Sequence, residues 1–319
     1  MGGPKARLFT FSSGGWVLAL ALVLTLGGTL WNLRSLLDPS RIRPRGDGRD
    51  PASYGFDLAS ATIPRATIAA SGMVADALPA LEHPATLAAS ELPEKYLVRD
   101  DKVIGVVLNG EARCYPLRVV AWHEIVNDVV GGIPIAVVDH PLSHAIAVFD
   151  RRAGGETLDF GVSGLLHQST LLMFDRRESH RGESLWSPLL ARAVAGPQAA
   201  KGTRLTVLPV ALARWDDWSR AWPKTRVLAP IVAERDRYDQ DVYGTYAGSD
   251  ALKFPVDPLP PRDGRPWKAV VFADPAGTLK DAAVDPAGTR TEVVGPSGTT
   301  PVPGTFAYWF AWYATRGPS

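Results

Sequence analysis

The stretch KVIGVVLNGEARCYPL, residues 102–117, carries the strongest fold signal in the sequence. Two apolar runs flank Asn109-Gly110, a dipeptide that favours the tight turn of a β-hairpin. The runs IPIAVVD, HAIAVFD and ETLDFGV follow between residues 133 and 162, separated by turn residues such as Gly154-Gly155. Apolar runs spaced about 8–12 residues apart are typical of a β-sandwich or barrel. We therefore expect a mainly β domain, a β-rich α+β fold, over residues 95–319.

Helical spacing is clear at one place in this region. Trp215, Trp218 and Trp222 in RWDDWSRAW recur at i, i+3 and i+7, which predicts a short amphipathic helix. The run TFAYWFAWYA at 305–314 is strongly apolar but too short to span a bilayer, so we expect a core strand or helix there. Between them, residues 255–304 form a Pro- and Gly-rich section of the same domain.

The N-terminus has the composition of a membrane anchor. No charged residue occurs from residue 8 to residue 33, and Trp16 and Trp31 enclose the most apolar part. Such a run is long enough to cross a bilayer as one helix. We expect residues 1–33 to be a tail and an uncleaved transmembrane anchor that contacts the lipid bilayer through residues 8–33. A cleaved signal peptide is the alternative.

The residues on either side of the anchor run indicate a tether and the location of the domain. Residues 34–94 are rich in Pro, Arg and Gly and are expected to form a tether and approach segment. Lys5 and Arg7 give the short N-terminal tail a positive charge, which fits a cytoplasmic N-terminus. The charge count alone is ambiguous, because five arginines follow the run, but a large C-terminal domain can be translocated despite such charges. We therefore expect a single-pass membrane protein whose C-terminal domain is extracytoplasmic.

Composition excludes several functional classes. The 34 basic and 33 acidic residues leave a formal net charge of +1, which gives no global electrostatic reason to bind nucleic acid. The single cysteine, Cys114, excludes an internal disulfide and a thiolate-rich metal site. No glycine-rich phosphate-binding loop follows a strand and opens a helix, so no organic cofactor is expected.

The histidines are the strongest candidates for chemistry. Five of the six lie between residues 123 and 180. His140 and His144 fall in DHPLSHA, and on an extended strand they would stand about 13 Å apart. A bend at Pro141 would bring them within reach of one metal ion. The predicted ligands are His140 and His144 with His123 or His167, and with Cys114 and Asp139 as lower-ranked donors; the predicted metal is copper before zinc.

Other mechanisms fit the motifs less well. His123-Glu124 begins like the helical zinc-protease pattern, but position 127 is Asn where that pattern needs a second histidine. Ser163 in FGVSGLL resembles a nucleophile elbow, but position 165 is Leu where that elbow needs Gly. Each histidine also has a purely structural alternative. The ten Trp and the WDDWSRAW stretch would suit a non-catalytic interaction module.

Several blocks together resemble one family. RCYPLRVVAWHEIVNDVVGGIPIAVVDHPLSHAIAVFDRR, LDFGVSGLLHQSTLLMFDRRES, ESLWSPL and FAYWFAWYA are similar, in this order, to the bacterial and archaeal family called domain of unknown function 3179. The resemblance runs from about Lys95 to Leu228 and returns at residues 306–314. It implies no known activity.

The chain departs from that family at one block. Members usually show Tyr-Cys-Pro-Leu-Cys where this sequence has Asp139-His140-Pro141-Leu142-Ser143. His167 also stands where the family commonly has a tyrosine or another residue. A Cys-x-x-Cys pair suits a redox couple or a soft metal. Histidine at the first position removes the disulfide chemistry and leaves a metal site available, although the change is equally consistent with a lost family function.

The sequence thus predicts a membrane-anchored extracytoplasmic protein that binds copper, or alternatively zinc, through clustered histidines. Its role would be metal handling or redox chemistry. The alternative is a non-catalytic accessory or interaction subunit beside a membrane-protein partner.

Overall fold

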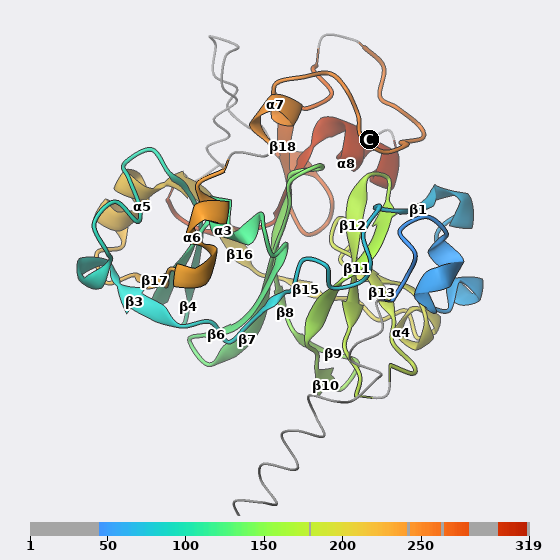
Figure 1. Ribbon diagram of the computed structural model, residues 1–319, viewed down its shortest axis with the longest axis horizontal. Coiled ribbons are helices and arrows are strands. Elements are labelled where there is room, and N and C mark those ends of the chain that lie inside the picture. Colours follow the sequence, from blue (N-terminus) through green and yellow to red (C-terminus); the bar gives the residue numbers. More distant parts are fainter. Residues whose placement is uncertain (1–44, 179, 241–242, 263–264, 281–298, 318–319) are drawn as a thin grey trace, which may run out of the picture. The chain divides into compact units, whose positions relative to one another are not determined.

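The computed structural model describes residues 45–178, 180–240, 243–262, 265–280 and 299–317. The described residues form three main antiparallel or mixed sheets, which confirms the expected β-rich fold (Figure 1). The predicted anchor at 8–33 lies outside the described residues. No helix among the residues that the structure describes is long and apolar enough to span a membrane.

The first sheet contains the predicted Asn-Gly hairpin. Asn109 and Gly110 both have positive φ, at 48° and 81°, as the tight turn requires. The hairpin strands pair in register from Val103 with Pro116 to Leu108 with Glu111. The strand order is β20-β16-β4-β5-β17-β3, with β20 (Val302–Pro303), β16 (Pro209–Arg214), β4 (Lys102–Leu108), β5 (Glu111–Pro116), β17 (Arg226–Leu228) and β3 (Thr86–Ala88).

The second sheet is central and contains the runs IPIAVVD and HAIAVFD. Its order is β19-β18-β21-β8-β7-β6-β2, and a short strand, β15 (Thr206–Val207), also pairs with β8. The strands are β19 (Leu279–Lys280), β18 (Val270–Ala273), β21 (Thr305–Tyr308), β8 (Ala145–Asp150), β7 (Ile133–His140), β6 (Ile125–Val130) and β2 (Leu81–Glu82).

The third sheet has the order β1-β11-β12-β13-β14. Its strands are β1 (Ile68–Ala70), β11 (Phe160–His167), β12 (Thr170–Asp175), β13 (Leu185–Ser187) and β14 (Arg192–Ala195). A separate two-stranded ribbon pairs β9 (Arg152–Ala153) with β10 (Glu156–Thr157) around the predicted Gly154-Gly155 turn.

The central sheet is buried on both faces, which explains why its strands β7 and β8 are almost continuously apolar. Along β7, Ile135 and Val137 belong to the core shared with the first sheet. Ala136 and Val138 belong to the core shared with the third sheet. Successive side chains of a strand point to opposite faces. The β7 strand therefore places apolar side chains on both faces of the sheet.

Helices are short and lie at the margins of the sheets. The predicted tryptophan helix is α5 (Trp215–Ala221), and Trp218 is fully buried against the outer face of the first sheet. The run at 305–314 contains both predicted alternatives, because β21 leads directly into α8 (Trp309–Arg316). The other helices are α3 (Leu117–Val120), α4 (Pro197–Ala200), α6 (Arg235–Tyr238), α7 (Gly244–Ala247), η2 (Pro51–Tyr54), η3 (Leu58–Ser60), η4 (Arg65–Thr67), η5 (Ala89–Glu91) and η6 (Val232–Glu234).

Residues 45–94, whose composition predicts a tether and approach segment, pack into the fold instead. Strand β1 adds to the third sheet by pairing Ile68 with His167. Tyr54, Phe56 and Ile68 are buried against the outer face of that sheet. The Pro and Gly residues of this segment therefore lie in short turns that pack on the surface of the third sheet.

Candidate functional site

The block Asp139-His140-Pro141-Leu142-Ser143 forms the tip of the β7–β8 hairpin. His140, the last residue of β7, pairs with Ala145, the first residue of β8, and residues 141–144 form the loop between them. The Ser143 amide donates to the His140 carbonyl at 3.1 Å, which closes a β-turn. His144 then has a φ of 49°, in the left-handed region that most side chains avoid.

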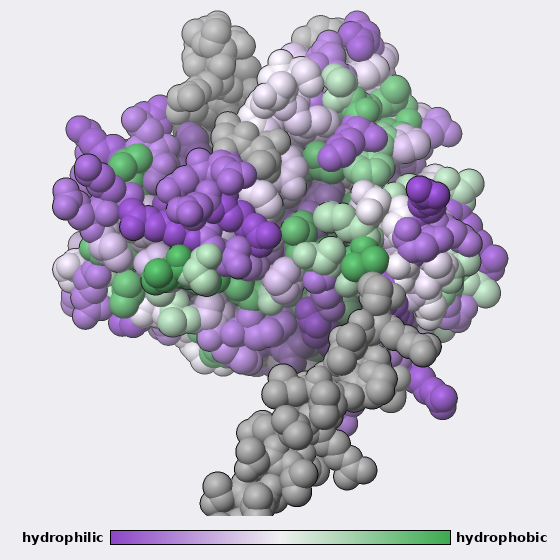
Figure 2. Space-filling view, in the orientation of Figure 1, coloured by the Kyte–Doolittle hydropathy of each residue, from purple (hydrophilic) through white to green (hydrophobic). Residues whose placement is uncertain are grey.

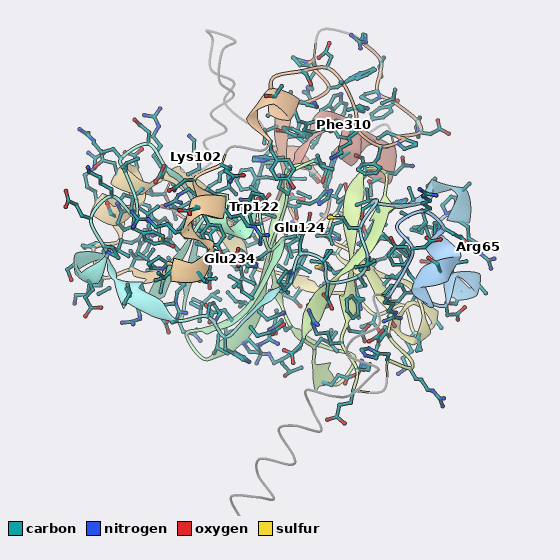
Figure 3. The ribbon with its side chains drawn as sticks, in the orientation of Figure 1. Arg65, Lys102, Trp122, Glu124, Glu234 and Phe310 are labelled. Atoms are coloured by element: carbon teal, nitrogen blue, oxygen red, sulfur yellow. The ribbon has the colours of Figure 1, made fainter. Side chains whose placement is uncertain are left out.

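A buried glutamate meets this tip from the neighbouring strand. The β6–β7 hairpin pairs Ile125 with Val138, so Glu124 lies opposite Asp139, whose amide donates to the Glu124 carbonyl at 2.9 Å. Figure 3 shows Glu124 in the interior of the fold. Its carboxylate Oε1 lies 3.1 Å from Nδ1 of His140, which donates the hydrogen bond. Glu124 also has a positive φ, at 57°.

We call Glu124, Asp139, His140, Ser143 and His144 the hairpin-tip centre. Three of its side-chain atoms are buried without a hydrogen-bond partner: Asp139 Oδ1, His140 Nε2 and Ser143 Oγ. Buried polar groups are normally paired, so three unpaired atoms within one turn form an incomplete polar site. Non-glycine residues at positive φ, such as Glu124 and His144 here, also occur preferentially at functional sites.

The charges of the centre are not balanced by neighbouring cations. Burial, together with the nearby Glu124 carboxylate, holds the pKa of Asp139 well above its usual range. Among the described residues, neither Glu124 nor Asp139 forms a salt bridge with a lysine or arginine; the one ionic contact joins Glu124 to His140. Two acidic side chains therefore lie in a desolvated site whose basic groups are imidazoles.

The His144 ring makes an aromatic contact with the last strand of the domain. Its ring stacks on Tyr308 with the centroids 5.3 Å apart and the planes at 22°. Burial lowers the pKa of His144 to about 4, so its imidazole is neutral at physiological pH. A neutral imidazole has a lone pair available for a metal ion or a proton.

The segment from Tyr243 to Asp257 contacts the tips of two hairpins. The Tyr246 hydroxyl donates to the Leu142 carbonyl at 3.0 Å, in the β7–β8 loop. Asp257 exchanges two hydrogen bonds with the side chain of Gln168, in the β11–β12 turn. Burial, followed by the charges of Glu124 and Asp139, raises the pKa of Tyr243 to about 12. This segment thus covers the polar end of the central sheet.

The other predicted ligands lie on different faces. Both ring nitrogens of His123 are engaged, Nδ1 with the Pro79 carbonyl and Nε2 with the Tyr238 hydroxyl, each at 2.7 Å. His167 pairs with Ile68 at the edge of the third sheet and continues the face of Leu165, which is the outer face of that sheet. It therefore points away from the central sheet.

Cys114 is separated from the histidines by a whole sheet. It is fully buried in the core between the first sheet and α5. Burial raises the pKa of its thiol far above the usual range, which makes the thiol a weak nucleophile. Ser163 likewise has a structural role, because its hydroxyl donates to the Leu172 carbonyl and accepts from the Leu165 amide at 3.0 Å.

Strand alternation explains why these residues do not converge. Asp139 continues the β7 face of Ile135 and Val137, whereas His140 continues the face of Ala136 and Val138. Glu124 is the residue that interacts with both. Within the described ranges, no group of three or more His, Cys, Asp or Glu side chains is already positioned to hold a metal ion.

Sequence reasoning missed Glu124 and Ser143 as members of the site. The sequence presents Glu124 only as part of a protease pattern with His123. A signal was nevertheless present, because the tight turn at Gly131-Gly132 pairs Val130 with Ile133 and so places residue 124 opposite residue 139. Counting back from a predicted turn would therefore have found the pair.

The fold and the centre together define a class: a β-rich domain of three packed sheets with a buried, incompletely paired polar centre at one hairpin tip. The chain belongs to the family described as "Protein of unknown function (DUF3179)", whose model matches residues 75–294. This confirms the family resemblance drawn from the sequence blocks. Comparison with curated proteins and with solved structures gives no match.

Proposed function

We propose that the hairpin-tip centre binds one transition-metal ion, copper before zinc, with Nε2 of His140 as its first ligand. The observation that carries the proposal is the environment of this one ring. His140 is buried, its Nδ1 donates to the Glu124 carboxylate, and its Nε2 has no partner. A metal-binding histidine characteristically donates its other ring N–H to a carboxylate, which fixes the ring and the tautomer.

The remaining donors come from the same loop. His144 stacks on Tyr308, which belongs to the core on the Asp139 face of β7, so His144 lies on that face and His140 on the other. Asp139 Oδ1 and Ser143 Oγ contribute unpaired lone pairs nearby. These nitrogen and oxygen donors suit Cu(II) and Zn(II). Loading requires the 141–144 loop to rearrange, because strand alternation separates Asp139 from His140 before metal enters.

Electrostatics supports a cation at this place. Glu124 and Asp139 are both buried; among the described residues, Glu124 has one ionic contact, with His140, and Asp139 has none. An uncompensated buried carboxylate costs several kcal/mol unless it is protonated or paired. A divalent ion would provide the compensating charge, and its role would be metal handling or redox chemistry.

We further propose that the domain is held outside the cytoplasm by residues 8–33. The support is the sequence pattern alone: an uncharged run flanked by tryptophans after a short basic tail.

The test of metal binding is elemental analysis of the full chain after exposure to Cu(II) or Zn(II) and exhaustive dialysis. We expect about one metal ion per chain, lost in His140→Ala and reduced in affinity about 10- to 100-fold in Glu124→Gln. His180→Ala is the matched control, because the His180 side chain is 50% exposed and has a similar contact with a glutamate, Glu183. The control should bind metal like the parent.

Folding of each variant is checked by circular dichroism and thermal unfolding. If His140→Ala fails to fold, His140→Gln keeps the bulk and a hydrogen bond to Glu124 while it removes the imidazole. Metal-free protein that also refuses Cu(I), Cu(II) and Zn(II) would contradict the proposal. Full occupancy in folded His140→Gln would contradict it equally.

The alternative function, a non-catalytic accessory subunit, predicts a contiguous exposed apolar surface. The large apolar side chains exposed among the described residues come from five separate segments: Met73, Val98, Val129, Val232 and Leu259. On the face drawn in Figure 2, hydrophobic residues are interspersed with hydrophilic ones. The described surface therefore favours the metal proposal over this alternative, which stays a prediction.

A further inference from the structure

A second site candidate lies on the first sheet, away from the histidines. The β4–β5 turn at 109–112 and the connection from α5 to β17 at 222–226 enclose a recess of about 630 Å³. This volume falls within the range of small-molecule binding sites. The recess combines one large aromatic ring with two cationic side chains, Lys224 and Arg226.

The aromatic ring has a fixed orientation. Trp222 is half-buried, and its indole N–H donates to the Thr299 carbonyl at 2.9 Å. The ring also packs against the fully buried Trp218, with the centroids 5.9 Å apart and the planes at 36°. A tryptophan held at both its polar and its apolar edge provides a rigid, flat contact surface at low entropic cost.

The two cations at the rim form no salt bridge among the described residues, although the charge of Arg226 contributes to the lowered pKa of Glu111. Arg226 donates from Nε and Nη2 to the side chain and the carbonyl of Thr86, at 2.9 and 2.7 Å, which orients its guanidinium. Neither Arg226 nor Lys224 forms a salt bridge with a carboxylate of the described chain, and both are exposed. Glu111, the acidic residue of the lining, is already engaged by Arg113 and by the Gly131 amide at 2.9 Å. The recess therefore has an excess of positive charge beside an aromatic face.

We propose that this recess binds an acidic sugar unit. The apolar face of a pyranose ring would lie on Trp222, and its carboxylate would be bound by Arg226 and Lys224. Arginine suits this role because its planar fork matches a carboxylate, and its orientation by Thr86 leaves Nη1 free to donate. The proposal is independent of the metal site, because no residue is shared.

The test is calorimetric titration of the full chain with a hexamer of galacturonic acid. Parallel titrations use a neutral glucose hexamer and acetate. We expect saturable one-site binding of the acidic hexamer alone, weakened at least about tenfold by Arg226→Ala and by Trp222→Ala. Arg262→Ala is the matched control, because Arg262 is also exposed and lies over a tryptophan, Trp267, at 4.1 Å.

If Trp222→Ala does not fold, the double variant Lys224→Ala/Arg226→Ala decides, since both side chains are exposed. Absence of binding to the acidic hexamer would overturn the proposal. So would unchanged affinity in the double variant, equal binding of the neutral hexamer, or a loss in Arg262→Ala as large as the loss in Arg226→Ala.

Discussion

His140 and His167 show how one residue type acquires different properties from its surroundings. His140 has a carboxylate at Nδ1, which stabilises a defined tautomer. His167 has no such partner; burial, followed by the charge of Arg192, lowers its pKa to about 4. The orientation of the first ring is therefore fixed by a carboxylate, whereas the second ring is neutral at physiological pH.

Substitution of His167 should alter the pH dependence of stability. Between pH 4 and pH 6.5 the unfolded histidine binds a proton that the folded ring refuses, so the free energy of unfolding falls as the pH drops through this window. The contribution of one such ring is about 3 kcal/mol at most. We expect His167→Gln to lose less stability than the parent between pH 7 and pH 4, as measured by urea unfolding.

The control for this experiment is His180→Gln, because the His180 side chain is half exposed. It should show the pH dependence of the parent. Parallel curves for the parent and His167→Gln would contradict the assignment. His144, whose pKa is also about 4, contributes a similar slope that His167→Gln leaves in place.

At the level of elements, two hairpin tips form the polar end of the sheets, and each contains strained backbone. The β11–β12 hairpin pairs His167 with Thr170 and turns through Gln168 and Ser169, whose φ values are 52° and 62°. A two-residue turn with both φ values positive favours glycine or asparagine. Neither Gln168 nor Ser169 meets that preference, so the turn is maintained by its contacts.

This turn allows a paired test of strain against contact. Ser169→Gly should stabilise the protein by about 0.5–1 kcal/mol, because glycine adopts this conformation without a Cβ penalty. Gln168→Gly should destabilise it by about 1 kcal/mol. It relieves the same backbone strain as Ser169→Gly, but it also removes two hydrogen bonds to Asp257. Urea unfolding of both variants measures the difference. Equal effects of the two substitutions would show that the hydrogen bonds from Gln168 to Asp257 do not stabilise the Tyr243–Asp257 segment.

At the level of the whole molecule, the layering fixes which face of each strand can carry polar groups. The central sheet lies between two cores, so polar residues within its strands must be paired, as Asn127 and Asp128 of β6 are. The hairpin-tip centre is at one end of this sheet, and the Tyr243–Asp257 segment covers it. Entry of a metal ion would therefore require this segment or the loop beneath it to move.

The proposed extracytoplasmic location of the domain can be tested by labelling introduced cysteines, because the chain has only one cysteine of its own. Cys114 is buried, so the parent should not react with a membrane-impermeant maleimide. We expect Ala59→Cys, at an exposed position of the described domain, to be labelled in cells whose cytoplasmic membrane is intact. Gly3→Cys, before the anchor run, should be labelled only after lysis. Labelling of Ala59→Cys only after lysis would place the domain in the cytoplasm.

Local patterns in the sequence are sufficient to predict the family, the β-rich class, the Asn-Gly hairpin and the tryptophan helix. Each of these depends on neighbouring residues: a turn dipeptide fixes a hairpin, helical spacing fixes an amphipathic face, and blocks in order fix a family. The sequence also identified His140 as a candidate, because five of the six histidines lie between residues 123 and 180.

Which side chains meet depends on the packing of distant segments. Glu124 joins His140 through the pairing of β6 with β7, whereas His123 bonds to Tyr238 and His167 lies on the outer face of another sheet. Residues 45–94 likewise pack on the fold, although their composition suggested a tether. The reason is physical: a strand sends successive side chains to opposite faces, so closeness in sequence does not set closeness in space. Register and layer order, which are long-range properties, set it instead.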